Sequence, residues 1–170
     1  MPFFKDAQGA LHYLSSTDVT NAAGSGLPLP APDWAAITDD EAAAIQNPPL
    51  TVGQAQAQQI ALLEAAYSSA ITQPVTFTTA AGVKKTFQAD TDSQIVLIKA
   101  QQGYAIVGAV PDGFYWVASD NTQVPFTLED LKGLYAAMLA QGWTAFQRLQ
   151  TQKAAVRAAK TLAAVNAVVW

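Results

Sequence analysis

The stretch Val75-Thr-Phe-Thr-Thr-Ala-Ala-Gly82-Val-Lys-Lys-Thr-Phe87 has the pattern of a β-hairpin. It is the first of two such hairpins, each followed by a capped helix, and together they determine the architecture of this chain. The first strand of this hairpin alternates apolar and polar residues ahead of a glycine turn, which is typical of antiparallel strands. Asp90-Thr-Asp92-Ser-Gln94 follows, and its first residues can cap a helix. Residues 95–98 of that helix are apolar on too many sides for a surface helix, so we predict a central position.

The second hairpin reads Gly113-Phe-Tyr-Trp116-Val-Ala-Ser-Asp-Asn-Thr-Gln-Val-Pro-Phe126, and Thr127-Leu-Glu-Asp130 opens the last helix. Acidic residues in a first turn favour the positive end of the helix. Apolar residues at helical spacing predict one buried face, which includes Trp143: Leu128, Leu131, Tyr135, Met138, Leu139, Trp143, Phe146 and Leu149. Gly133 and Gly142 each cost roughly 1 kcal/mol against alanine there, which indicates close approach of another backbone.

The remaining elements follow from capping and turn signals. Thr51-x-x-Gln54 has the spacing of a capping box and predicts a helix to about Thr72. Residues 3–14 predict a small hairpin, residues 15–32 a linker or extended arm, and Thr38 a cap for a short helix. We therefore predict an α+β fold of helix, hairpin, helix, hairpin and long helix, with a small antiparallel sheet, in a domain over residues 51–170. Residues 1–50 form the N-terminal hairpin, arm and short helix; whether the two hairpins join into one sheet stays open.

Composition limits the classes of function. Charged residues make up 13% of the 170 residues, about half the usual ~25%. Such a surface suits a protein held in an assembly, although an alanine-rich genome would produce the same composition. A net charge of −4 argues against general nucleic-acid binding, and the absence of cysteine excludes disulfides and cysteine-zinc sites. No apolar run approaches the ~20 residues of a membrane span, and the first residues do not resemble a signal peptide, so we expect synthesis in a cytosol.

The sequence offers no set of residues for catalysis. His12 is the only histidine and has no neighbouring nucleophile in the sequence. The acidic residues at 39–41 and 129–130 are explained by helix capping. Asp90-x-Asp92 could bind a divalent ion, but it lacks the glycine and distal glutamate of a calcium loop, which favours a cap. We expect no enzyme, no catalytic residue, no cofactor and no metal.

The large aromatic residues are better candidates for function. Trp34 lies in a proline-rich segment, Trp116 in a hairpin, and Trp170 follows Val168 and Val169 at the end. Tryptophan is enriched where proteins bind one another. We therefore predict that these five residues bind a partner. The alternative is that the tryptophans pack back on their own domain.

Three motifs carry a family resemblance: Phe87-x-x-Asp90-x-Asp92-Ser-Gln94, the hairpin around Trp116, and Thr127-Leu-x-x-Leu131. With them, residues 65–159 resemble a domain of unknown function common in tailed-bacteriophage tail-fibre proteins. The first 48 residues, with Trp34-x-x-Ile37-Thr-Asp-x-Glu41, are similar to the start of phage tail-fibre assembly proteins.

The resemblance implies a tail-fibre assembly factor or fibre-bound tail protein that acts by protein–protein contact. The alternative is a permanent structural or receptor-facing component of the baseplate or fibre. The resemblance also implies tail-fibre or baseplate partners and a homo-oligomer such as a trimer. It further implies a place in the virion tail after synthesis in the host cytoplasm, and we expect no membrane insertion. A glycan hydrolase at a fibre tip would need paired carboxylates about 5–10 Å apart in a cleft.

Overall fold

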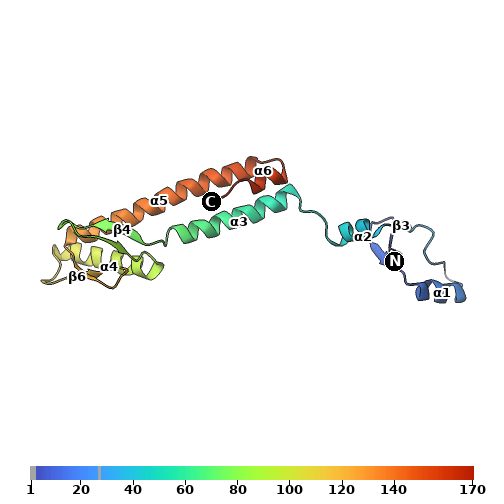
Figure 1. Cartoon of the computed structure of the whole chain (residues 1–170), viewed down its shortest axis with the longest axis horizontal. Helices are drawn as coiled ribbons and strands as arrows, with labels where there is room; N and C mark the ends of the chain where they lie inside the picture. The colour runs from blue at the N-terminus through green and yellow to red at the C-terminus, as the bar shows by residue number, and fades with distance from the viewer. Residues whose placement is uncertain (1–2, 27) are drawn as a thin grey trace. The chain divides into compact units, whose positions relative to one another are not determined.

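The computed structural model describes residues 3–26 and 28–170, and the chain forms two compact units. The first comprises Met1–Thr51 and the second Val52–Trp170. Figure 1 shows the elements of both units. Among the described residues, no helix combines the length and the apolar character that crossing a membrane requires.

The first unit is a three-stranded antiparallel sheet with two helices. Its strand order is β2-β1-β3, which confirms the predicted hairpin and adds a third strand. The elements are β1 (Phe3–Lys5), β2 (Leu11–Tyr13), α1 (Ser16–Gly24), β3 (Ala35–Ile37) and α2 (Asp39–Gln46). The linker prediction is wrong over α1. Ser15 and Asp18 form a capping box there, and this local pair starts a helix in a segment of loop-like composition.

The second unit confirms the predicted α+β order of helix, hairpin, helix, hairpin and long helix. Its elements are α3 (Val52–Ala70), β4 (Val75–Thr78), β5 (Lys84–Phe87), α4 (Thr91–Val107), β6 (Tyr115–Val117), β7 (Gln123–Pro125), α5 (Leu128–Ala158) and α6 (Leu162–Asn166). Each hairpin forms its own two-stranded sheet. The two are nevertheless adjacent, because Ser119 N–H donates a hydrogen bond to the Thr86 carbonyl at 2.8 Å.

The predicted caps of α4 and α5 are confirmed. The Asp90 carboxylate accepts a hydrogen bond from Ser93 N–H at 3.0 Å at the start of α4. Thr127 Oγ1 accepts one from Asp130 N–H at 3.2 Å at the start of α5. Side-chain acceptors at these positions satisfy amide groups that have no partner inside the helix.

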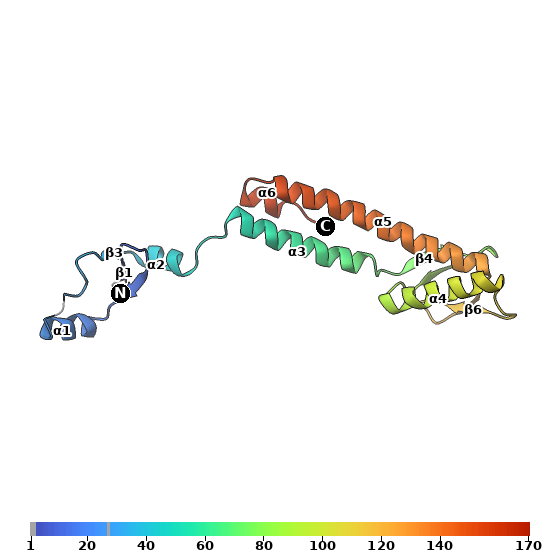
Figure 2. The same ribbon diagram turned by 180° about the vertical axis from the view of Figure 1, so that it is seen from behind.

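Two cores hold the second unit together. The hairpin core lies among β4–β7, α4 and α5, and a T-shaped contact joins Phe87 and Phe126 with ring centroids 5.2 Å apart. The helical core lies where α3 and α5 run side by side and α6 folds back on them (Figures 1 and 2). Gln56 of α3 ties these helices further, because its amide donates to the Val156 and Ala159 carbonyls, both at 3.0 Å.

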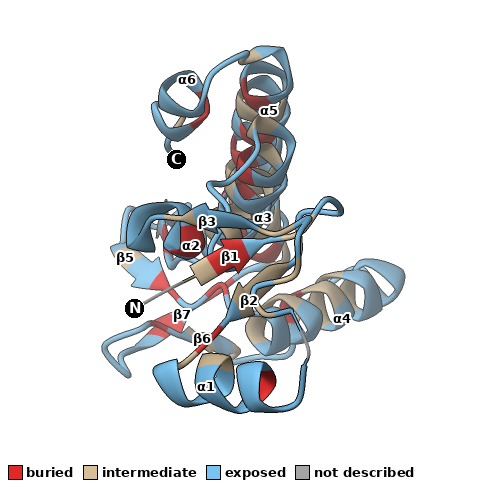
Figure 3. Ribbon diagram, turned by 90° about the vertical axis from the view of Figure 1, so that its right-hand side faces the viewer, coloured by how far each residue is buried: buried red, intermediate tan, exposed pale blue. Residues whose placement is uncertain are grey.

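The prediction that residues 95–98 are central is wrong for two of them. Leu97 is fully buried, but Ile95 is 43% exposed and Val96 55% exposed. Figure 3 shows α4 mostly in the colours of intermediate and exposed residues. The reason is that α4 packs on α5 and the hairpins with one side only, so the apolar residues around the rest of the helix stay uncovered.

The two glycines of α5 have different environments. A Cβ atom on Gly133 would lie 2.7 Å from the Phe77 ring, so a side chain makes the predicted close approach instead of a backbone. A Cβ atom on Gly142 would meet nothing within 4 Å, so that prediction is wrong within this chain. The space at Gly142 is open, and the helix carries the weaker residue without an internal reason.

This difference gives a matched pair of substitutions. Gly142→Ala should raise the free energy of unfolding by about 0.5–1 kcal/mol, because alanine is the better helix former. Gly133→Ala should gain nothing or lose about 1–2 kcal/mol, because the new methyl group must displace the packed Phe77 ring. Urea unfolding of the full chain in dilute solution measures both. Equal effects of the two substitutions would contradict the packing described here.

Candidate interaction surfaces

An apolar groove opens where α3, α4 and α5 converge. It has a volume of about 630 Å³. We call it the α5 groove, and its lining residues are Tyr67, Ile71, Gln94, Ile98, Tyr135, Met138, Leu139, Gly142, Trp143 and Phe146. None of these carries a formal charge. A concave apolar surface of this size is typical of a binding site.

Trp143 lies in this groove and is 60% exposed, so the prediction that it belongs to the core is wrong. Its ring stacks on that of Phe146 at a centroid distance of 5.8 Å, and Leu139, one turn earlier, is 56% exposed. The buried stripe of α5 runs instead through Leu134, Met138, Ala145 and Leu149. The apolar residues of α5 therefore cover more of the helix circumference than α3 and α4 can bury.

A second apolar surface lies between α4 and the outer side of β6. Trp116 contributes to two adjoining hollows there, of about 430 and 620 Å³. We call it the α4–β6 surface, and its apolar and aromatic lining residues are Val96, Ala100, Tyr104, Val107, Phe114, Tyr115, Trp116 and Val117. The inner side of Trp116 packs on Phe114 and Phe126, with centroid distances of 6.4 Å to each. Trp116 thus bridges the core and the surface, and Val107 is 76% exposed beside it.

The edge of β6 opposite β7 has no strand partner among the described residues, although Ser119, just beyond β6 on this edge, donates its amide to the Thr86 carbonyl of β5. On the inner edge, Ala118 N–H donates to the Thr122 carbonyl, and Phe126 N–H donates to the Phe114 carbonyl. Because backbone groups alternate in direction along an antiparallel strand, those of Tyr115 and Val117 point away from β7. Tyr115, Trp116 and Val117 also line the smaller of the two hollows, and the part of this edge without a partner is confined to Tyr115 and Val117.

Trp34 packs within its own unit. Its ring stacks on His12 at a centroid distance of 3.8 Å and lies 6.4 Å from Phe4. This arrangement explains the half-buried position of Trp34, and the predicted partner contact stays a prediction.

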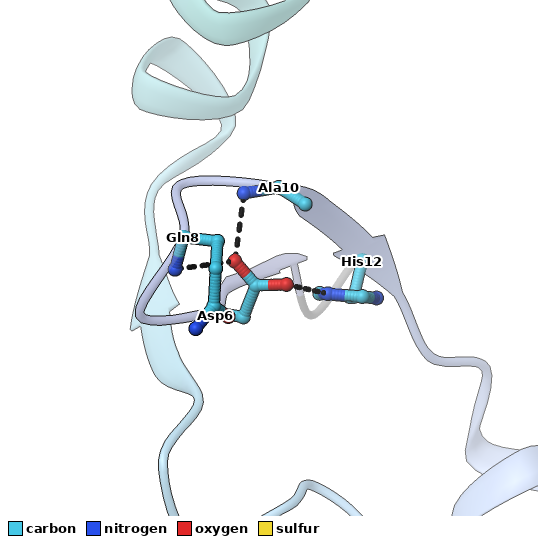
Figure 4. Close-up of polar contacts among 4 residues, drawn as sticks. All are labelled: Asp6, Gln8, Ala10 and His12. Atoms are coloured by element: carbon cyan, nitrogen blue, oxygen red, sulfur yellow. Dashed lines mark hydrogen bonds and ion pairs between the residues drawn. The ribbon is translucent and has the colours of Figure 1, made fainter.

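His12 also hydrogen-bonds Asp6, with 2.9 Å between Nε2 and Oδ2 (Figure 4). The other carboxylate oxygen of Asp6 accepts from the amides of Gln8 at 3.0 Å and Ala10 at 2.8 Å. The hydrogen bond from His12, followed by that from Ala10, holds the pKa of Asp6 below its usual value. The carboxylate thereby organises the β1–β2 turn, which is a structural role.

The C-terminal residues fold back on the helical core. The Arg148 guanidinium lies 5.0 Å from the centre of the Trp170 ring, which is a cation–π contact. Gln59 donates a hydrogen bond to the Val168 carbonyl at 2.6 Å. Val169 is 66% exposed, so of the three predicted residues here it is the one that stays mostly open to solvent.

The acidic residues form no cluster with the make-up of a metal site: among residues 3–26 and 28–170, no three His, Cys, Asp or Glu side chains are grouped in that way. The α5 groove was not predicted from the sequence. One signal could have revealed it, because the apolar residues of α5 span a wider arc than the single stripe that one neighbouring layer buries.

The second unit is thus an α+β domain whose described surface offers apolar grooves for contact. Residues 54–169 match the model of the family described as "Domain of unknown function (DUF4376)", which covers more than half of the chain. The chain belongs to this family. Searches of curated proteins and of solved structures gave no significant match.

Proposed function

We propose that this protein is a tail-fibre assembly factor or fibre-bound tail protein of a tailed bacteriophage and acts by protein–protein contact. The observation that carries this proposal is the α4–β6 surface, which combines exposed apolar side chains with a strand edge that has no strand partner over Tyr115–Val117. The sequence motifs that resemble tail-fibre-associated proteins are the reason for proposing a tail-fibre protein as the partner. The low content of charged residues, 13%, agrees with a protein held in an assembly.

In this proposal an extended segment of the partner adds to β6. The backbone groups of Tyr115 and Val117 provide hydrogen bonds at every second residue, which only an extended chain can match. The hollows on either side of Trp116 then accept apolar side chains of that segment. Strand addition provides affinity through the backbone, and the hollows provide selectivity.

The test is co-expression of the full chain with the tail-fibre protein encoded by the adjacent gene. We expect a complex that co-purifies, and more soluble fibre protein than without the chain. The double variant Val96→Glu with Val107→Glu should weaken the complex at least about tenfold, because two carboxylates would have to leave water on binding. Leu162→Glu is the matched control, because Leu162 is 38% exposed on α6, outside this surface. Absence of both a complex and an effect on solubility would refute the proposal.

The second candidate is a permanent structural or receptor-facing component of the baseplate or fibre. The same contact surface would serve it. Quantitative mass spectrometry of purified virions separates the two, because a permanent component is present in stoichiometric amounts and a released assembly factor is absent. Glycan release by the isolated protein would instead favour an enzyme.

A further inference from the structure

We propose that two copies of this chain associate through their α5 grooves, with the two α5 helices antiparallel around a two-fold axis that passes between Gly142 and Trp143. This contact is separate from the α4–β6 surface and would give a dimer in place of the trimer that the resemblance implies. Four observations carry it: the spacing of the exposed residues, the shape around Gly142, the charge of the lining, and the exposed area.

The spacing is that of a helix-pairing seam. Tyr135, Leu139, Gly142 and Phe146 follow one another at intervals of four, three and four residues and line the groove from one helix. This alternation is the pattern by which one helix packs along another. The C-terminal part of α5 already packs on α3 within the chain, around Leu149 and Val156. The uncovered part of the seam is therefore suited to a second helix.

The shape around Gly142 favours the antiparallel arrangement. The space beside Gly142 is empty to 4 Å, and the stacked rings of Trp143 and Phe146 are exposed next to it. Around the proposed axis, Trp143 of each copy lies over Gly142 of the other, and Leu139 lies opposite Phe146. A parallel pair would bring ring against ring at Trp143 and leave the two glycine notches facing each other. The notch also provides a reason for a helix-weakening glycine in the middle of α5.

The charge of the lining favours a second copy as the occupant. The chain carries a net charge of −4, so close contact between two copies is opposed least where the facing surfaces carry no charge. All ten residues that line the α5 groove are uncharged. The α4–β6 surface, by contrast, includes Asp92 and Lys99. The groove thus allows self-contact without placing like charges together.

The exposed area suits the apolar centre of a dimer interface. The exposed fractions of Trp143, Phe146 and Leu139 correspond to roughly 300 Å² of apolar surface, given ~150–250 Å² for a large side chain. A standard interface buries about 800 Å² per partner, with an apolar centre and a polar rim. The three side chains account for less than half of that area, so the interface must also include the half-exposed lining residues and the flanks of α5, which has 31 residues and spans about 46 Å.

The association state of the full chain provides the first test. Sedimentation velocity should show a dimer, and Trp143→Glu should weaken it by at least about tenfold. Gly142→Leu, which fills the notch and suits a helix, should weaken the dimer similarly. Leu162→Glu should leave it unchanged. A wild-type chain that stays monomeric at every concentration, or that forms a trimer, would overturn the proposal.

The second test determines orientation and uses the absence of native cysteine. Leu139→Cys and Phe146→Cys are made separately with different tags, mixed, and oxidised. The antiparallel arrangement predicts a disulfide between the two variants in the mixture and little cross-linking of either alone. Efficient cross-linking of each variant with itself would overturn it. The fibre-binding assay separates this dimer from the proposed function, because Trp143→Glu should still bind the fibre protein and the Val96→Glu, Val107→Glu variant should still form the dimer.

Discussion

Replacing Phe87 with alanine is expected to lower the free energy of unfolding of the second unit by about 3–5 kcal/mol. Phe87 is fully buried, and its ring contacts those of Phe126 at 5.2 Å and Phe77 at 6.5 Å between centroids. Removal of the ring loses its transfer free energy and leaves a cavity between β5 and α5. The neighbouring rings cannot fill it easily, because the hairpins and two helices fix their positions.

Guanidinium unfolding followed by far-UV circular dichroism measures this loss, because most of the helical signal belongs to the second unit. Phe146→Ala is the matched control. The Phe146 ring is 41% exposed, so its removal in dilute solution should cost less than half as much. Similar losses for the two variants would show that the hairpin core is not where the stability of the unit resides.

The fold was predictable where its signals are local. The caps at Asp90 and Thr127, the turns of both hairpins and the apolar spacing of α5 each involve residues close together in sequence. Such signals determine which element forms. The helix α1 was missed because its capping pair, Ser15 and Asp18, lies among residues that usually form loops.

Burial was less predictable, because it depends on packing between distant segments. The apolar pattern of α5 contains both Met138 and Trp143, but the structure buries the first and exposes the second. The pattern cannot state how far α3 and α4 reach over α5. Trp34 and Trp170 differ in the opposite way: the sequence made them candidates for an exposed partner contact, but Trp34 packs on His12 and Trp170 packs on Arg148. The sequence could therefore predict that aromatic residues form the candidate surfaces. Which of these residues are exposed to solvent depends on the packing, and the sequence pattern does not show it.

The second large effect is expected at Asp130, whose replacement by alanine should cost about 3 kcal/mol. Asp130 is only 3% exposed, and its carboxylate joins the β4–β5 turn to the start of α5. It accepts hydrogen bonds from Ala80 N–H at 2.7 Å, Thr127 N–H at 2.9 Å and the Thr127 hydroxyl at 2.7 Å. Hydrogen bonds to a charged group contribute about 1.5–3 kcal/mol, and amides left without an acceptor add a further penalty.

The stabilisation that Asp130 contributes to the fold should decrease as the pH falls. Burial raises the pKa of Asp130, but the hydrogen bonds from Ala80 and Thr127 more than offset it, so the pKa lies below its usual value in the folded chain. The stabilisation is therefore complete above the unfolded-state value of ~3.9 and is lost as pH falls through the lower folded-state value.

Unfolding of the wild type and of Asp130→Asn over a pH series measures this loss. The substituted amide would keep the shape of the side chain without its charge, so the difference between the two proteins should be constant near neutral pH and shrink below about pH 4. Asp112→Asn, in an exposed loop, should change stability by less than about 0.5 kcal/mol and provides the control. A difference that persisted unchanged into strong acid would mean that the loss in Asp130→Asn comes from its NH2 group, which cannot accept from Ala80 or Thr127, and that the negative charge of Asp130 is not what holds the β4–β5 turn against α5.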